Sequence, residues 1–238
     1  MSNVSYVALS RQQALASELT SVANNIANAD TAGFRRDAFI FSEYVNALRG
    51  EPSLSQTRIG GRMIDAAQGD VVATDGPLDV AIEGAGFFTV ETPAGPRLTR
   101  AGAFAVNDAG VIATAQGYAV GGEGGAPIAL PPGAGRIVIS ADGVVSADGV
   151  QVGRFELVDA PPTALVREGD NLFRVTGETT AIDQPKLRQG HLEGSNVNAV
   201  LEISRLIEVQ RAFEMGQQMM NEETERQRRA IETLGGNR

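Results

Sequence analysis

The sequence predicts an α+β protein. Paired long helices from the N- and C-terminal ends are expected to form a coiled-coil-like stalk, with an antiparallel, glycine-rich β domain inserted between them. Three observations predict this class: apolar residues at helical spacing near the N-terminus, similar spacing near the C-terminus, and short alternating runs with turn signals between. We expect five segments: an N-terminal stalk helix (1–33), an extended connector (34–75), the β domain (76–175), a return connector (176–195) and a C-terminal stalk helix (196–238).

The N-terminal helix is predicted from a row of apolar residues at steps of four, three and four. This row is Leu15, Leu19, Val22 and Ile26. Such spacing places the side chains on one helix face, as in the seam of a coiled coil. We expect the helix to stop near Gly33, a residue that adopts left-handed backbone conformations easily.

The C-terminal helix is predicted to start near Asn196 or Asn198, either of which could cap it. Polar residues occupy about half of its seam positions, which favours a helix with several neighbours over a simple two-stranded zipper. Two helices alone bury little surface, so we expect neighbouring copies to supply the missing contacts. The apolar seam residues are Ile203, Leu206, Phe213, Met220, Ile231 and Leu234.

The middle of the chain has the pattern of short antiparallel strands. Runs such as Leu78–Ile82 and Phe155–Val158 alternate with turn signals such as Asp142-Gly143 and Asp148-Gly149. The segment before it, Asp37–Asp75, has an ambiguous pattern. It could be extended chain along the stalk, or partly helical around Phe39–Leu48.

Composition limits the possible partners. The chain has 238 residues, a net charge of −9 and no cysteine. An acidic chain is a poor partner for nucleic acid or anionic lipid, which both favour basic surfaces. No apolar stretch reaches the ~18 residues of a membrane-spanning helix, so we expect no membrane insertion. No cleavable signal peptide is visible at the N-terminus.

No catalytic, cofactor-binding or metal-ligating residues are predicted. His191 is the only histidine, and the carboxylates Asp65, Asp70, Asp75 and Asp79 do not have the spacing of a calcium loop. The charged run 222–229 has two interpretations, a solvated helix face with i,i+4 pairs or contacts between subunits.

Three stretches of the sequence, in order, resemble the flagellar rod and hook family of axial proteins. They are Asn24–Arg35 (NNIANADTAGFR), Thr74–Phe88 (TDGPLDVAIEGAGFF) and Gly190–Asn198 (GHLEGSNVN). The resemblance extends over nearly the whole chain. Within the family, the opening Tyr6–Gln12 and the modest length look most like a proximal rod member, and a distal rod member is the alternative.

This resemblance implies a structural subunit of the flagellar basal body, not an enzyme, that needs no cofactor. Its implied partners are other proximal and distal rod proteins, copies of itself and the flagellar type III export apparatus, which would deliver it to the periplasm without signal cleavage. The terminal helices would line the tube and the β domain would face outward. A secreted β-domain binding module, such as an adhesin, and an enzyme with an unrecognised site are the alternatives from other classes. The implied assembly and junction residues are Asn24, Asn25, Asn28, Thr31, Gly33 and Phe34.

Overall fold

The computed structural model describes residues 3–46 and 54–235, with side chains described at 8–38, 63–229 and 231–233. The chain divides into two compact units. The terminal unit comprises residues 1–27, 37–63 and 198–238, and the β unit comprises residues 28–36 and 64–197. The chain therefore passes between the units four times, after residues 27, 36, 63 and 197.

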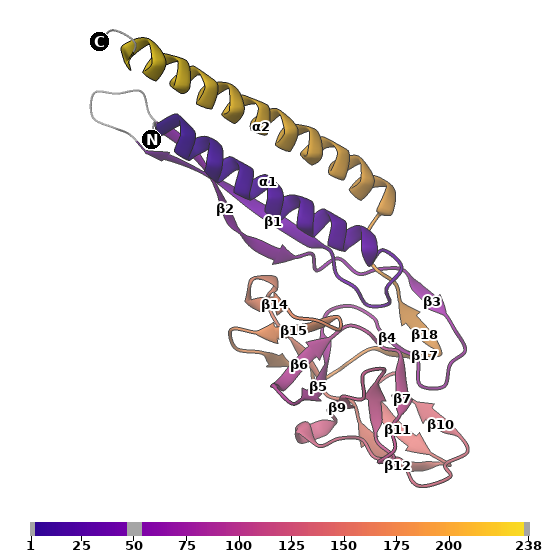
Figure 1. Ribbon diagram of the computed structural model, residues 1–238. Helices are drawn as coiled ribbons and strands as arrows, with labels where there is room; N and C mark the ends of the chain where they lie inside the picture. Colours follow the sequence, from indigo (N-terminus) through magenta and orange to yellow (C-terminus); the bar gives the residue numbers. More distant parts are fainter. Residues whose placement is uncertain (1–2, 47–53, 236–238) are drawn as a thin grey trace. The chain divides into compact units, whose positions relative to one another are not determined.

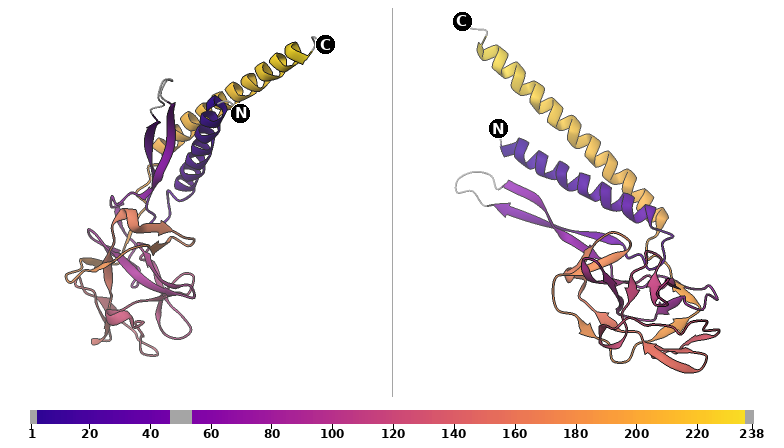
Figure 2. Two further views of the ribbon diagram at one scale, coloured as in Figure 1. Left: turned by 90° about the vertical axis from the view of Figure 1, so that its left-hand side faces the viewer. Right: turned by 60° about the horizontal axis from the view of Figure 1, so that its bottom comes forward.

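The terminal unit combines two helices with a β-hairpin. Helix α1 spans Asn3–Ala27, and helix α2 spans Ala199–Gly235. Strands β1 (Asp37–Asn46) and β2 (Leu54–Ile64) pair as a two-stranded sheet. Helix α1 lies between α2 and this hairpin (Figures 1 and 2).

Local chemistry explains where α2 begins. The Asn198 side-chain oxygen accepts a hydrogen bond from the Leu201 N–H at 3.1 Å, which is the geometry of an N-cap. The helix then runs for 37 residues without a proline, a length of about 55 Å at 1.5 Å per residue.

The expected stalk of paired helices in a coiled coil is wrong. The described residues form only two α-helices, one near each end, and these two helices share their unit with a β-hairpin. Of the expected seam residues on α2, Ile203 and Ile231 are exposed. The buried positions of α1 include Gln12, Glu18 and Asn25. A coiled coil needs apolar side chains at its contact positions, and here polar side chains are buried among the apolar ones.

The ambiguous segment after residue 36 forms strands. Strand β1 includes residues 39–46 of the stretch Phe39–Leu48, where a helix was the alternative. Residues 47 and 48 lie outside the described residues. The expected five-segment division of the chain stays a prediction.

The β unit is built from short strands, and every strand pair with a described register is antiparallel. Its largest sheet has the order β14-β15-β6-β5-β9-β8-β7, with β13 pairing both β5 and β16. Smaller sheets pair β10-β11-β12, β17-β4 and β18-β3. The strands are β3 (Val71–Ala73), β4 (Val80–Ile82), β5 (Phe87–Thr92), β6 (Gly95–Thr99), β7 (Phe104–Val106), β8 (Ile112–Thr114), β9 (Ala119–Val120), β10 (Ile137–Ile139), β11 (Val144–Ala147), β12 (Val150–Arg154), β13 (Leu157–Asp159), β14 (Leu165–Arg167), β15 (Leu172–Val175), β16 (Thr180–Ala181), β17 (Leu187–Gln189) and β18 (His191–Glu193).

Two hydrophobic clusters form the core of the β unit. The larger cluster contains an aromatic trio, in which the Phe88 ring meets those of Phe104 and Phe155 edge-on, with centroids 5.0 and 5.5 Å apart. The smaller cluster includes Phe87 and Phe173, whose centroids are 5.7 Å apart. Aromatic pairs at this spacing stabilise a core beyond their buried area.

Within the described ranges, no helix is long and apolar enough to cross a membrane.

Candidate functional site

The junction residues expected from the sequence divide between the two units. Asn24 and Asn25 lie in the last turn of α1, in the terminal unit, while Asn28, Thr31, Gly33 and Phe34 belong to the β unit. Asn24 is exposed, whereas Asn25 is only 1% exposed. The structure therefore does not gather these six residues into one cluster.

Asn25 joins three elements of the terminal unit. Its side-chain oxygen accepts a hydrogen bond from the Asp37 N–H at 2.9 Å, and its Nδ2 donates to the Asp37 carbonyl oxygen at 3.0 Å. The same Nδ2 donates to the Glu202 carboxylate on α2 at 3.1 Å. The amide thus pairs with the backbone at the start of β1 as a neighbouring strand would. It attaches this strand to both helices.

Gly33 lies at a close approach of two backbones within the β unit. Its N–H donates to the Glu193 carbonyl oxygen at 2.7 Å, and its φ of 67° lies in the left-handed region. A Cβ at this position would come within 2.4 Å of the Arg100 and Ala101 backbone. Only glycine satisfies both constraints. The helix itself stops earlier than expected, at Ala27, so Gly33 does not cap it.

Phe34 is held against β14 and β15. The Arg167 guanidinium carbon lies 4.2 Å from the Phe34 ring centroid and 5.0 Å from that of Phe173. Arg167 also donates a hydrogen bond to the Arg35 carbonyl oxygen. A guanidinium at such distances from two rings makes favourable cation–π contacts. Phe34 is 3% exposed and packs as an anchor.

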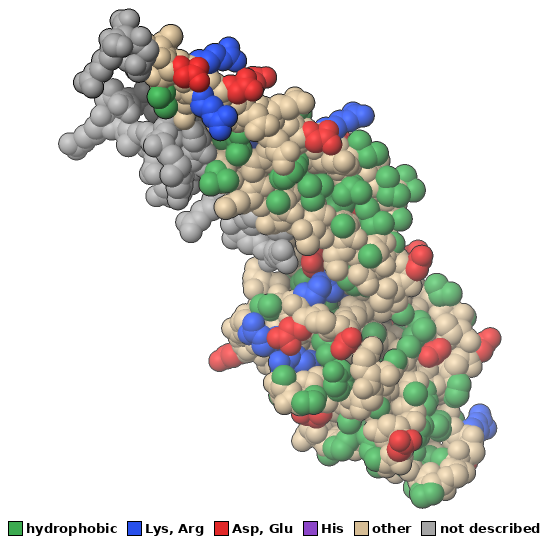
Figure 3. Space-filling model, in the orientation of Figure 1, with side chains coloured by type: hydrophobic (Ala, Val, Ile, Leu, Met, Phe, Trp, Pro, Cys, Tyr) green, Lys and Arg blue, Asp and Glu red, His purple; other side chains and the backbone are tan. Residues whose placement is uncertain are grey.

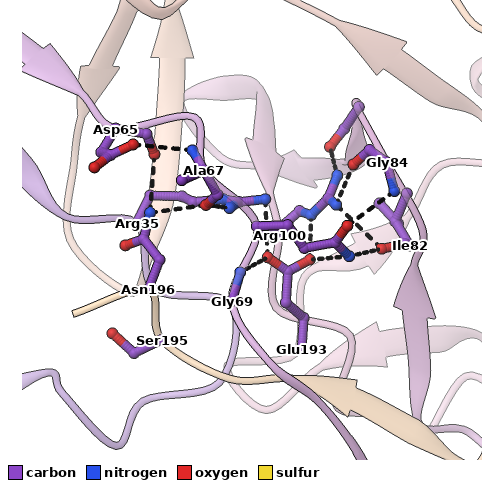
Figure 4. A network of polar contacts seen from close by, with 12 residues as sticks. Arg35, Asp65, Ala67, Gly69, Ile82, Gly84, Arg100, Glu193, Ser195 and Asn196 are labelled. Carbon is purple, nitrogen blue, oxygen red and sulfur yellow. Dashed lines mark hydrogen bonds and ion pairs between the residues drawn. The ribbon is translucent and has the colours of Figure 1, made fainter. Parts of the chain in front are cut away.

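A buried ion cluster lies next to Phe34 (Figure 4). The Glu193 carboxylate accepts from Arg35 Nη2 at 2.8 Å and from Arg100 Nε at 2.6 Å, and all three side chains are almost fully buried. The remaining donors of Arg100 bond to the carbonyl oxygens of Ile82, Gly84 and Gly86. Burying charges is costly unless they are paired and hydrogen-bonded. Here both guanidiniums pair with Glu193, although the buried Arg35 Nε has no hydrogen-bond partner among the described residues.

The position of Arg35 is reflected in its pKa. Removal from water lowers the pKa of its guanidinium, and the attraction of Glu193 opposes this effect. The cluster thus holds two cations and one anion in the interior, and Glu193 is the counter-ion that they share.

Asn196 holds two backbone segments of the β unit together, at Arg36 and at Asp65–Ala67. Its side-chain oxygen accepts from the Arg36 N–H at 2.6 Å, and its Nδ2 donates to the carbonyl oxygens of Asp65 and Ala67 at 3.2 and 2.8 Å. The neighbouring N–H, that of Asp37, is bound by Asn25 in the other unit. Two asparagines therefore hold the two sides of the crossing between residues 36 and 37.

An ion pair and a hydrogen bond connect α1 with α2. Arg205 pairs with the buried Glu18 at 2.5 Å, and Gln12 Nε2 donates to the Phe213 carbonyl oxygen at 2.9 Å. Of the expected seam residues, Val22 is buried, and Ile203 and Ile231 are exposed. The side chain of Leu234 lies outside the described residues, and Leu15, Leu19, Ile26, Leu206, Phe213 and Met220 are half-buried.

The N-terminal half of α2 exposes several large apolar side chains, alongside charged residues such as Arg205 and Glu208. Figure 3 shows hydrophobic side chains gathered over this half and charged side chains over the other. Val200 is 73% exposed and Ile203 47% exposed. A water-facing helix surface normally carries polar residues. The exposed apolar residues between positions 200 and 219 are Val200, Leu201, Ile203, Ile207, Met215 and Met219.

The residues weighed as catalytic or metal-binding candidates have local roles. His191 Nδ1 lies 2.9 Å from the Gln189 carbonyl oxygen, Asp65 accepts from the Ala67 N–H, and Asp79 accepts from the Thr74 hydroxyl. Among the described residues, no three potential ligands come together as a metal site.

The ion cluster was not predicted from the sequence, and neither were the hydrogen bonds of Asn196 to the backbone of distant residues. Arg35, Glu193 and Asn196 all lie inside or beside stretches that carry the resemblance. Nothing in their spacing indicates that residues so far apart in sequence meet. Arginine is usually exposed, so the sequence does not indicate that Arg100 is buried.

Comparisons with known proteins identify the family. Three family models match in order along the chain: "Flagella basal body rod protein" at residues 6–35, "Flagellar hook protein FlgE/F/G D1 domain" at 81–147 and "Flagellar basal body rod FlgEFG protein C-terminal" at 188–233. The first model ends at the ion cluster's Arg35, and the third includes Glu193.

Whole-chain relatives agree with these models. The chain is 40% identical to the flagellar basal-body rod protein FlgF of Caulobacter vibrioides over 99% of each chain, and 38% identical to FlgF of Rhizobium meliloti over 98% of each. FlgG of Caulobacter vibrioides is 36% identical over 84% of this chain and 87% of its own length. The chain therefore belongs to the flagellar basal-body rod protein family, matches its FlgF members better than FlgG, and is a structural subunit of the flagellar basal body rather than an enzyme.

Proposed function

We propose that this subunit polymerises helically in the proximal rod, through its terminal unit, with copies of itself and with other axial proteins. The observation that carries this proposal is the exposed apolar half of α2. Each of Val200, Ile203 and Ile207 has almost half or more of its surface in water. Covering such side chains is worth about 25 cal/mol per Å² of apolar area.

The exposed faces of α1 and α2 suggest how neighbouring copies would contact one another. Between residues 16 and 24, the exposed positions of α1 carry small or uncharged side chains such as Ala16, Thr20 and Ala23, which differ from the large apolar side chains on α2. A contact between two different faces of neighbouring copies builds an open helical filament when its rotation does not close into a ring. The terminal helices would then line the tube, with the β unit facing outward.

The six expected junction residues would support this assembly indirectly. Asn25 fixes the start of β1, and Gly33 and Phe34 fix the chain on the β unit. We propose that they keep the helices in a form that neighbours can bind, and that the buried or half-buried seam residues, such as Val22 and Leu206, contribute to the contact between α1 and α2.

The assembly proposal is tested with the double variant Ile203→Glu/Ile207→Glu, placed in the chromosome. Because both side chains are exposed, the monomer should unfold within about 0.5 kcal/mol of wild type. Isolated basal bodies viewed by electron microscopy should nevertheless lack a complete rod. The matched control Gln217→Glu/Gln218→Glu adds the same charge at exposed polar positions of α2 and should leave rods intact.

Complete rods and normal swimming in the double isoleucine variant would exclude this face as the assembly contact. A separate in-frame deletion of the gene tests the position in the rod. Arrest at the start of the rod indicates a proximal subunit, and arrest near its outer end indicates a distal one.

We also propose that the subunit leaves the cytoplasm through the flagellar type III export apparatus without signal cleavage. Family membership and the absence of cysteine, which leaves no disulfide to obstruct unfolding, support this route. Cell fractionation tests it: in cells whose export apparatus is disabled, the full-length chain should stay in the cytoplasm. A periplasmic pool of unchanged size in these cells would overturn the route.

A further inference from the structure

Residues 31–36 are bound by the β unit much as a peptide ligand is bound by a receptor. The residues from Ala32 to Arg36 each contact strands or loops that follow later in the sequence. The Ala32 carbonyl oxygen accepts a hydrogen bond from Asn171 Nδ2 at 3.0 Å, and the Gly33 N–H donates to the backbone carbonyl oxygen of Glu193 at 2.7 Å. Backbone contacts therefore fix the register of the segment.

Side chains of the segment add to this attachment. The Phe34 ring packs against Arg167, and the Arg35 guanidinium pairs with the shared carboxylate of Glu193. The Phe34 carbonyl oxygen accepts from the Asn196 N–H, and the Arg36 N–H donates to the Asn196 side chain. An apolar anchor, a buried ion pair and a matched backbone are the components of specific peptide recognition.

The segments on either side of residues 31–36 belong to the terminal unit. Helix α1 ends at Ala27, and β1 begins at Asp37. The described later partners of this segment, from Asp65 to Asn196, all lie in the β unit.

We propose that the β unit contains a binding site for its own Thr31–Arg36 segment, and that this segment stays docked when α1 and β1 lose their order. It acts as a latch that keeps the N-terminal region attached to the β unit before assembly. This inference goes beyond the proposed function and does not rest on it, because it concerns the isolated subunit.

Hydrogen–deuterium exchange of the purified full-length chain tests the latch. The amides of Gly33, Phe34 and Arg36 should exchange at least about tenfold more slowly than those of α1, and should match β5 and β6. Exchange of residues 31–36 at the rate of α1 would overturn the proposal.

Two variants alter only the docked segment. Gly33→Ala places a Cβ against the Arg100 backbone, and Phe34→Ala removes the ring that packs on Arg167. Each should speed the exchange of residues 31–36 at least about tenfold and leave β5 and β6 protected. The control is Gly117→Ala, which has a similar positive φ of 86° but no neighbour within 4 Å of the added Cβ, and it should leave residues 31–36 protected.

Two outcomes would count against the latch. Unchanged protection of residues 31–36 in both segment variants would show that the contacts do not hold the segment. Equal loss of protection in β5, β6 and residues 31–36 would show that the segment is an inseparable part of the core and not a docked peptide.

Discussion

The two units differ in the size of their apolar cores. The β unit encloses Phe88, Phe104 and Phe155 in an apolar core, while the contacts of the terminal unit include the buried polar side chains Glu18 and Asn25. Helix α2 buries Val209 but leaves six large apolar residues between positions 200 and 219 exposed to water. Burial of apolar surface is the main stabilising contribution to a folded domain. The β unit therefore has its own extensive apolar core, whereas the terminal unit leaves apolar side chains of α2 uncovered.

The largest expected effect tests the apolar core of the β unit. Phe88 is 0% exposed, so Phe88→Ala should lower the free energy of unfolding by about 3–5 kcal/mol, from lost burial and a residual cavity. Thermal and denaturant unfolding followed by circular dichroism measures this change. The exposed Val150→Ala should stay within about 0.5 kcal/mol of wild type, and similar losses in the two variants would contradict a core centred on Phe88.

A second change removes the shared counter-ion. Glu193→Gln leaves Arg35 and Arg100 buried without a carboxylate, and should destabilise the β unit by about 3 kcal/mol or more. Chemical denaturation gives the loss. Glu83→Gln is the control, since its partner Arg188 is half exposed, and it should cost at most about 1 kcal/mol. If both variants lost equally little, the buried cluster would not stabilise the unit.

A third change addresses the terminal unit alone. Asn25→Ala removes the bonds to Asp37 and Glu202, and should cost about 1–3 kcal/mol. The loss should appear as faster hydrogen exchange in α1 and β1, with the main unfolding transition of the β unit unchanged. Gln13→Ala, at an exposed position of α1, is the control. A shift of the β-unit transition in Asn25→Ala would argue that the units do not unfold separately.

The smallest expected effect depends on pH. Hydrogen bonds from the Arg136 and Gly135 N–H groups lower the pKa of Asp148 in the folded chain. A carboxyl with a lowered folded pKa stabilises the fold above its unfolded pKa, and this contribution is lost as pH falls through the folded pKa. The melting temperature of wild type should therefore exceed that of Asp148→Asn most at neutral pH, and the difference should shrink in acid.

Asn is a suitable replacement here because Asp148 has a φ of 50°, which Asn tolerates. Asp108→Asn, at an exposed turn, serves as the control. A difference between wild type and Asp148→Asn that stayed constant down to pH values below the usual Asp range would contradict the prediction.

The sequence was informative where a local pattern determines structure. Asp148-Gly149 was predicted as a turn and joins β11 to β12, with Ala147 opposite Val150. Asn198 was one of two expected caps and is the residue that caps α2. The family was recognised from its motifs. These features depend on a few neighbouring residues, so their chemistry can be read directly from the chain.

The coiled-coil stalk was predicted wrongly because periodicity does not show what a helix face contacts. Ile203 fits the apolar row but faces solvent, and the polar Glu18 lies in the helix contact because Arg205 neutralises it. The ion cluster was missed for a related reason. Arg35 and Glu193 are 158 positions apart in the numbering (193 − 35), and only the folded chain brings them together.

The four crossings of the chain between the units have a mechanical consequence. A single linker lets two domains rotate about it, and relative motion is the usual expectation for domains joined this way. Here the backbone passes between the units after residues 27, 36, 63 and 197, so any twist of one unit against the other must deform four covalent strands together. Four such connections restrict the rotation of one unit against the other more than a single linker would.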